Sequence, residues 1–227
     1  MLKFSKKKST NEANSARIAE LLLTRFTHDM AGPISAVANG IDFILDSKIT
    51  DDGGAVEIRN QAIDLVDDSS KQSLARLQAY RVAYGIVYKK DTPTETDELK
   101  DIVKRFFQKS QVEVRWNSST PKTITAEARK LCISMILTIS RVMIYGGKIS
   151  ISFLNGGQTI SVKSQSSKFK VPDQIQGILL NKSNIQPDVE NVPYFLIREL
   201  CEDSNIKIDF EYSDDEVKTV KFETAFP

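Results

Sequence analysis

Two long stretches of helical periodicity, separated by a short polar segment, constrain the fold of this chain most strongly. Apolar residues recur every three or four positions over residues 15–47, and the same spacing returns over residues 55–88. The segment between them, DSKITDDGG, offers Asp51 and Asp52 as helix caps and two glycines as turn residues. The pattern predicts an antiparallel hairpin of two long helices.

Each helix of this hairpin would carry a wide apolar stripe, which a hairpin alone leaves in contact with water. Two hairpins can bury their stripes together, so we expect a homodimer whose four helices form a bundle. Packing of the stripes against the rest of the same chain is the alternative. The stripe residues are Ile18, Leu21, Leu22, Phe26, Met30, Val37, Ile41, Ile44 and Leu45, then Val56, Ile63, Val66, Leu74, Leu77, Tyr80 and Tyr84.

The charged segment YKKDTPTETDE, which contains Pro93, marks a domain boundary. We expect a disordered basic lead-in over residues 1–14, a helical domain over 15–91 and a second domain over 92–227. In the second domain ISISFLNGGQTISV reads as a β-hairpin, because alternating apolar residues flank an Asn-Gly-Gly turn. The order of elements predicts an α+β chain whose second domain is an α/β sandwich, a sheet with helices on one face. Helices are expected at 97–109, 126–145 and within 172–203, and strands at 111–116, 148–154, 159–163, 207–212 and 217–223.

Composition excludes several classes of function. The 31 Lys and Arg residues nearly balance the 30 Asp and Glu residues, so no overall field favours nucleic acid or an anionic membrane. No window reaches the roughly 20 continuous apolar residues of a membrane-spanning helix. Cys132 and Cys201 lie far apart and only one histidine is present, which suggests neither a disulfide framework nor a zinc site. We expect a cytoplasmic protein without nucleic-acid, membrane or metal partners. Its two cysteines and the helix over residues 126–145 are expected to pack in the core and to take no part in chemistry.

The single histidine, His28, lies on the polar side of the first predicted helix. Steps of three and four residues from it meet only small or polar side chains. An imidazole in such surroundings faces a flat, open surface, to which a partner protein could bring an electrophile. An ordinary surface histidine without chemistry is the alternative. The neighbours on this side are Thr24, Arg25, Ala31, Gly32, Ser35, Asn39, Asp42 and Asp46.

Three residues near His28 fit a nucleophilic role for the neutral ring. Asp29 offers an acceptor that orients the imidazole, and Arg25, one turn earlier, offers a cation for a phosphoryl group or for acidic residues of a partner. Pro33 has no amide hydrogen and its ring crowds the carbonyl of Asp29, so we expect a helix kink beside the histidine. A tolerated kink without function is the alternative.

The run HDMAGPISAVANGIDFIL resembles the phosphoacceptor helix of bacterial sensor kinases, because an acidic residue follows the histidine and a proline stands five positions after it. It is more particularly similar to the ChpT-type histidine phosphotransferases of alphaproteobacteria. The resemblance implies a dimerisation and phosphoacceptor domain followed by a degenerate kinase ATP-binding domain. His28 would then accept a phosphoryl group from the receiver domain of a hybrid histidine kinase and pass it to a response regulator receiver. The docking surface would comprise Thr24, Ala31, Gly32, Ser35 and Asn39.

Loss of nucleotide binding has separate support in the second domain. The ATP-binding domain of such kinases needs an asparagine on its central helix to help hold magnesium, and glycine-rich loops that admit adenine and phosphates. No asparagine occurs between Ser118 and Leu154, and Gly177 is the only glycine after Gly157. We therefore expect this chain to bind no ATP and no cofactor, with Mg²⁺ supplied by the partner receiver.

Gly32 departs from the kinase pattern, since many kinases place Thr or Asn four residues after the histidine for phosphatase activity. That activity is therefore not implied here. Two rival functions stay open at this point. One is a pseudokinase-like dimeric adaptor that binds response regulators without phosphotransfer. The other is an ATP-dependent histidine kinase, against which the missing glycines and asparagine argue.

Overall fold

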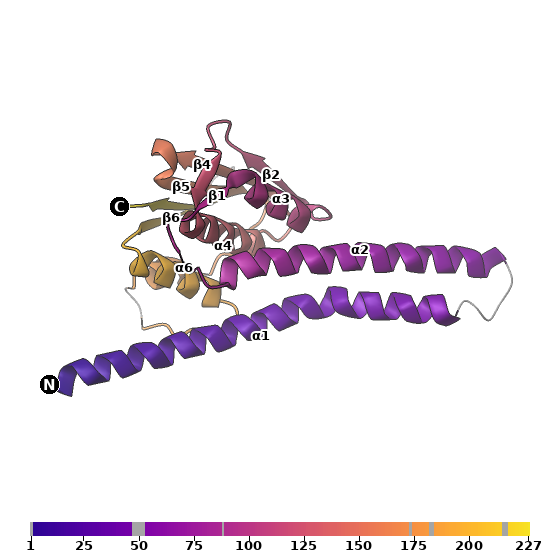
Figure 1. Cartoon of the computed structure of the whole chain (residues 1–227), viewed down its shortest axis with the longest axis horizontal. Helices are drawn as coiled ribbons and strands as arrows, with labels where there is room; N and C mark the ends of the chain where they lie inside the picture. The colour runs from indigo at the N-terminus through magenta and orange to yellow at the C-terminus, as the bar shows by residue number, and fades with distance from the viewer. Residues whose placement is uncertain (1, 47–52, 88, 173, 182–183, 215–217) are drawn as a thin grey trace.

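A computed structural model describes residues 2–46, 53–87, 89–172, 174–181, 184–214 and 218–227. Figure 1 shows two long antiparallel helices, α1 (Leu2–Asp46) and α2 (Gly53–Tyr84), with a C-terminal domain packed over one end of the pair. The predicted helical hairpin is therefore confirmed. The predicted loop with Asp51 and Asp52 lies outside the described residues.

The ends of both helices differ from the expectation. Helix α1 begins at Leu2, so residues 2–14, for which the sequence predicts a disordered lead-in, belong to the helix. This segment contains no proline or glycine, and its four lysines, its glutamate and its alanine are strong helix formers. Helix α2 ends at Tyr84, before the predicted residue 88, because Gly85 follows and favours termination.

The two helices approach each other closely at Gly40. A Cβ atom at this position would lie 2.6 Å from Val66 Cγ2 and 3.2 Å from the carbonyl oxygen of Ala62. Ala62 is itself buried in this contact. Two small residues thus set the distance between the helices in the half of the hairpin that extends beyond the C-terminal domain.

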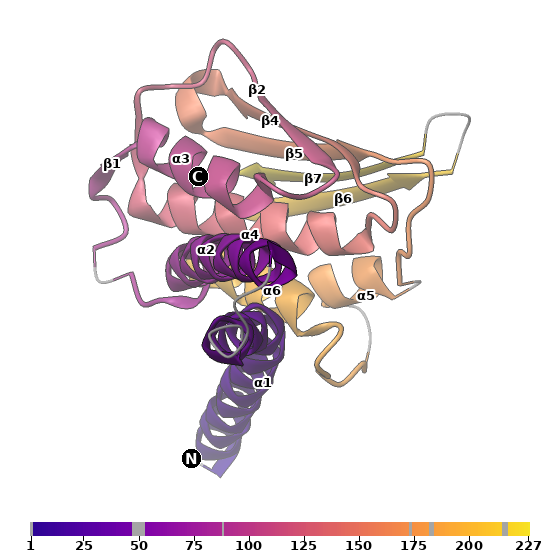
Figure 2. The same cartoon turned by 90° about the vertical axis from the view of Figure 1, so that its right-hand side faces the viewer.

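The C-terminal domain is a five-stranded sheet of order β2-β4-β5-β7-β6 with helices on one face (Figure 2), which confirms the α+β prediction. Only the β2–β4 pair is parallel. A second sheet, β1 with β3, was not predicted, because each strand has only three residues. The elements are β1 (Pro93–Glu95), α3 (Thr96–Phe107), β2 (Val112–Trp116), β3 (Thr123–Thr125), α4 (Ala126–Val142), β4 (Gly147–Leu154), β5 (Thr159–Gln165), α5 (Ile175–Leu179), α6 (Val192–Asp203), β6 (Lys207–Ser213) and β7 (Thr219–Ala225).

Helix α4 forms the centre of the core, as its uniformly apolar sequence predicted. Leu131, Cys132 and Ile136 have no exposed surface, and Cys201 is 2% exposed, so both cysteines are buried. The helix ends at Val142, earlier than expected. Gly146, with a φ of 73°, follows closely and turns the chain into β4.

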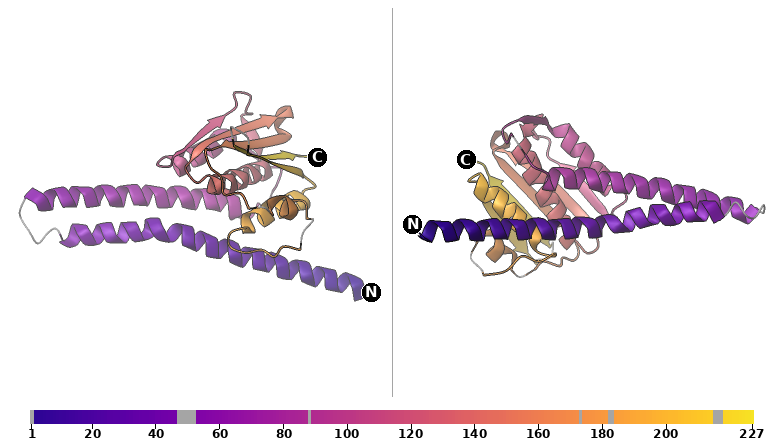
Figure 3. Two further views of the ribbon diagram at one scale, coloured as in Figure 1. Left: turned by 180° about the vertical axis from the view of Figure 1, so that it is seen from behind. Right: turned by 60° about the horizontal axis from the view of Figure 1, so that its bottom comes forward.

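The hairpin packs against the C-terminal domain along only part of its length (Figure 3). Ile18, Leu21 and Tyr80 belong to the same core cluster as the apolar residues of α4 and the sheet. Packing within the chain, the alternative to dimerisation, thus accounts for one part of the apolar stripes. The projecting part keeps large exposed apolar residues: Ile34, Ile41, Phe43, Leu45, Val56, Ile58, Ile63 and Leu65. Within the described residues, no helix combines the length and the apolar character that crossing a bilayer requires.

Candidate functional site around His28

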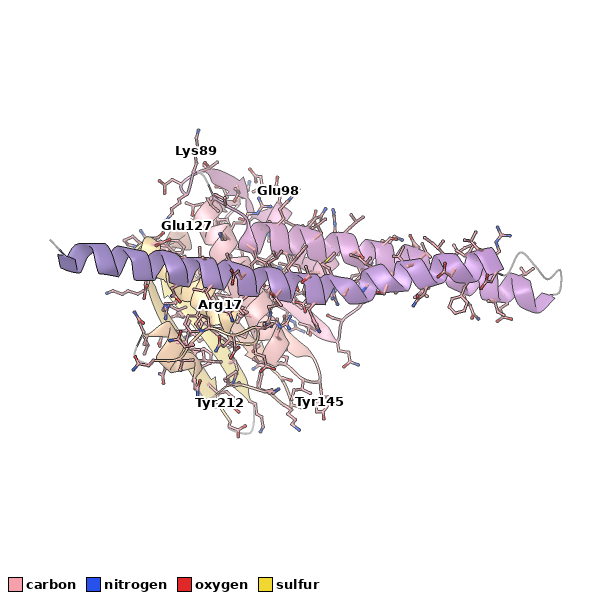
Figure 4. All side chains as sticks on the ribbon, turned by 90° about the horizontal axis from the view of Figure 1, so that it is seen from below. Arg17, Lys89, Glu98, Glu127, Tyr145 and Tyr212 are labelled. Carbon is pink, nitrogen blue, oxygen red and sulfur yellow. The ribbon has the colours of Figure 1, made fainter. Side chains whose placement is uncertain are left out.

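The imidazole of His28 stands open on the surface of α1. Its side chain is 85% exposed. The predicted neighbours Thr24, Ala31, Ser35 and Asn39 are also exposed along this helix. Apart from the chain neighbours and the nearby backbone of α1 itself, no described atom lies within 4 Å of the position that a Cβ of Gly32 would occupy. These residues leave an unobstructed strip on which a second protein has access to the ring. In the view of Figure 4, α1 lies across the C-terminal domain, with Tyr145 and Tyr212 on one side of it and Lys89 and Glu98 on the other.

The carboxylate of Asp29 lies beside this ring but points toward the interior. Its Oδ1 atom is 3.5 Å from Nδ1 of His28, at the long end of hydrogen-bond distances. Its Oδ2 atom accepts a hydrogen bond of 2.7 Å from the hydroxyl of Tyr80 on α2. The same oxygen forms an ion pair of 2.6 Å with Nη1 of Arg141 on α4. The side chain of Asp29 is only 10% exposed. Through these contacts its carboxylate connects His28, the second helix and the C-terminal domain.

The backbone carbonyl of Asp29 also has a partner on α2, and the sequence reason is Pro33. Because Pro33 has no N–H group, the carbonyl of Asp29 lacks its usual donor within the helix. Nη1 of Arg76 on α2 takes that place, at 2.5 Å from the carbonyl oxygen. Helix α1 continues through Pro33 and changes direction between its two halves (Figure 1). The proline thus frees a carbonyl for a bond between the two helices next to His28.

Aromatic rings pack around Tyr80, whose hydroxyl donates to the Asp29 carboxylate. Tyr80 stacks on Tyr84 with ring centroids 5.3 Å apart and meets Phe26 edge to face. Burial raises the pKa of Tyr80 far above its ordinary value, and the hydrogen bond to Asp29 acts in the same direction. Burial also raises the pKa of Tyr84 to about 12. Both hydroxyls therefore stay protonated at neutral pH, and that of Tyr80 remains a donor to the carboxylate.

Arg25 makes contacts that differ from those predicted. It is 5% exposed, and its Nη1 donates hydrogen bonds to the carbonyl oxygens of Val189 and Glu190, in the segment that precedes α6. In this structure the side chain ties α1 to the C-terminal domain instead of lying on an open surface. Arg25 stands three positions before His28, so it is rotated by about 60° from His28 around the helix axis. The C-terminal domain covers that side of α1.

Three functional contacts of this site were missed by sequence reasoning. The sequence pattern places Tyr80 in an apolar stripe, indicates no role for Arg76 and predicts no chemistry for α4, whose Arg141 binds Asp29. One local signal was present for Arg141, since it is the only charged residue of α4 after Lys130. Nothing local indicated that its partner would lie 112 positions earlier in the chain.

Comparison with known proteins identifies the family through the C-terminal domain and shows a similar fold over most of the chain. The family model described as histidine phosphotransferase C-terminal domain matches residues 96–216. The chain is 25% identical over 198 residues to the protein phosphotransferase ChpT of Brucella abortus (strain 2308), which covers 84% of this chain and 88% of that protein. A solved bacterial phosphotransferase superposes with a TM-score of 0.74 at 21% identity, over 92% of this chain and 96% of that one. The catalytic domain of histidine kinase ThkA has a TM-score of 0.43 at 13% identity, over 60% of this chain and 96% of that one.

The hydrogen bond from Tyr80 to Asp29 leads to a prediction about stability. Replacement Tyr80→Phe removes a donor from a nearly buried carboxylate and should lower the free energy of unfolding by about 1.5–3 kcal/mol, as measured by urea denaturation at pH 7. Tyr84→Phe is the matched control, because no hydrogen bond of the Tyr84 hydroxyl is found in the described part of the chain; it should cost less than about 0.5 kcal/mol. Equal losses in the two variants would show that the Asp29 bond contributes nothing specific.

Proposed function

Since this chain belongs to the histidine phosphotransferase family, as the pattern around its histidine predicted, we propose that it relays phosphoryl groups through His28 in a bacterial two-component phosphorelay. The observation that carries this proposal is the geometry of the single imidazole of the chain. The ring is 85% exposed on a flat helix face, and the carboxylate beside it is fixed by two other elements. A nucleophile that must reach a phosphoryl group held by another protein needs this combination of access and fixed orientation.

The proposed reaction begins when a receiver domain carrying an aspartyl phosphate docks along the strip of Thr24, Ala31, Gly32, Ser35 and Asn39. Nε2 of His28 attacks the phosphorus in line. The P–N bond forms as the bond between phosphorus and the receiver carboxylate oxygen breaks, and the carboxylate leaves. A second receiver, that of a response regulator, then takes the phosphoryl group by the reverse chemistry. The first receiver would be that of a hybrid histidine kinase, and each receiver would supply the Mg²⁺ that its own phosphorylation site uses.

Asp29 serves in this proposal as a positioning residue. Its Oδ1 atom faces Nδ1 of His28, so the carboxylate favours a proton on Nδ1 and leaves the lone pair of Nε2 free to attack phosphorus. Tyr80 and Arg141 hold the other oxygen, which prevents the carboxylate from rotating away. Arg25 is assigned the role of fixing α1 against the C-terminal domain.

The transfer should proceed without ATP. Helix α4 contains no asparagine, and the later glycine-rich loop of nucleotide-binding relatives is missing. The chain thus supplies a nucleophile and geometry, and its phosphate donor comes from outside. A cytoplasmic location, where receivers and their kinases meet, is part of the same proposal. Both cysteines are free and buried, as in proteins of a reducing compartment.

The homodimer proposed for this function rests on the exposed apolar residues of the projecting hairpin. Ile34 and Ile41 on α1 are seven residues apart, and so are Val56 and Ile63 on α2. All four are more than 40% exposed. Apolar residues that recur every seven positions are typical of helices that pack against partner helices in a bundle. A second copy of the hairpin would cover the apolar stripes of both helices, and the two copies would together form a four-helix bundle.

Transfer from a receiver phosphorylated with labelled phosphate tests the central step. We expect acid-labile, base-stable label to appear on the wild-type chain and to be absent from His28→Ala, because the chain has no other imidazole. Asp29→Asn keeps the shape but removes the charge, and it should slow the transfer at least about tenfold.

Three outcomes would refute this assignment. Label that persists in His28→Ala would place the phosphoryl group elsewhere. Receiver binding without any label on the wild-type chain would favour an adaptor. Labelling directly from ATP would instead identify a kinase.

Dimerisation can be tested with one substitution in the apolar stripe. Ile63→Glu places a charge at a position that is 45% exposed in the single chain but would be buried in the bundle. We expect analytical ultracentrifugation to show a wild-type mass of two 25.5 kDa chains and a dissociation constant raised at least about tenfold in the variant. Leu154→Glu, at a position 41% exposed on the C-terminal domain, is the matched control and should remain dimeric. A monomeric wild-type chain would contradict the bundle.

A further inference from the structure

A cavity of about 370 Å³ opens next to His28. It is bounded by α1, the end of α4, the segment after β5 and the segment that leads into α6. Three basic side chains line it, and Glu190 is the acidic residue among the lining. The basic residues are Arg25 from α1, Arg141 from α4 and Lys170 from the segment after β5. The cavity therefore has a net positive lining directly beside the proposed phosphoacceptor.

Arg25 is a buried cation that lacks a counterion in the described part of the chain. Its Nη1 atom is bonded to the carbonyl oxygens of Val189 and Glu190, which carry no charge. Its Nε atom is buried and has no acceptor among the residues that the structure describes. A buried charge is costly unless it is paired, and an unsatisfied buried donor adds to that cost. An anion in the adjoining cavity, which Arg25 lines, would supply the missing charge.

Arg141 and Lys170 provide further donors at the same cavity. The ion pair of Arg141 with Asp29 uses only one end of a guanidinium that has five N–H groups, and the side chain remains 40% exposed. Lys170 is exposed, and its backbone N–H donates 2.8 Å to the carbonyl of Val142 at the end of α4. That bond fixes the segment carrying Lys170 next to Arg141. The basic side chains therefore come from two domains and converge on one space.

We propose that this cavity is a phosphate-binding site that holds the phosphoryl group carried by His28, an inference that rests on the proposed function. A phosphoryl group has a charge of about −1.5 to −2 at neutral pH and three acceptor oxygens. Arg25, Arg141 and Lys170 match that charge and offer donors to those oxygens. The C-terminal domain thereby contacts the phosphorylated state directly. No bond is made or broken in this site; it binds the group that the transfer step has delivered.

The first experiment titrates inorganic phosphate into the unphosphorylated full-length chain at constant ionic strength, with calorimetry as the readout. We expect saturable binding that Lys170→Gln weakens about threefold to fivefold, the range for removal of one exposed charge. Lys168→Gln is the matched control, since Lys168 is exposed two residues away and does not line the cavity; it should bind phosphate as the wild type does. Absence of saturable binding, or an equal loss in both variants, would overturn the site.

The second experiment identifies the occupant. His28 is phosphorylated chemically with phosphoramidate, and the titration with inorganic phosphate is repeated. A phosphoryl group that occupies the cavity should weaken phosphate binding at least about tenfold. Unchanged phosphate affinity would overturn the assignment to His28. Phosphotransfer to His28 in a chain that binds no phosphate would leave the proposed function intact and refute the cavity alone, whereas phosphate binding without phosphotransfer would refute the proposed function.

Discussion

The carboxylate of Asp29 is the point at which the parts of this molecule meet. It lies beside the imidazole on α1, accepts a hydrogen bond from Tyr80 on α2 and forms an ion pair with Arg141 of the C-terminal domain. A nearly buried carboxylate is tolerated only when its charge is compensated, so both partners are required by the same physical constraint. The orientation of His28 therefore depends on the packing of two helices and a second domain.

In the function proposed here, the C-terminal domain has a role that requires no nucleotide. Several polar contacts besides the Asp29 ion pair connect it to the hairpin. Lys130 on α4 donates 2.7 Å to the carbonyl of Gly85, and Lys109 forms an ion pair with Asp68. In the function proposed here the phosphate arrives on another protein, and a domain fixed against the hairpin serves to hold the site in one geometry.

Much of the fold could be predicted because its signals are local. The helical periodicity of α1 and α2, the Asn-Gly-Gly turn between β4 and β5, and the uniformly apolar α4 are each read from neighbouring residues. The start of α1 was missed because its polar lead-in has no apolar stripe, although its composition favours a helix. The three-residue strands β1 and β3 were missed because such short segments show no alternation.

The site was predictable only where a single helix determines it. The open position of His28 follows from the small and polar residues around it on α1. The burial of Arg25 does not, since the helix alone cannot show which of its strips the second domain covers. The partners of Asp29 were out of reach for the same reason: Tyr80 and Arg141 are 51 and 112 positions away, and only tertiary packing brings them together.

The claim that Asp29 sets the state of the imidazole is tested most directly by ¹⁵N NMR of the single histidine in the full-length chain. At a pH where the ring is neutral, we predict that Nδ1 carries the proton and that Nε2 is unprotonated, because the fixed carboxylate faces Nδ1. In Arg141→Ala the carboxylate is released, and the population of this tautomer should fall. A wild-type ring with its proton mainly on Nε2, unchanged in Arg141→Ala, would contradict the claim.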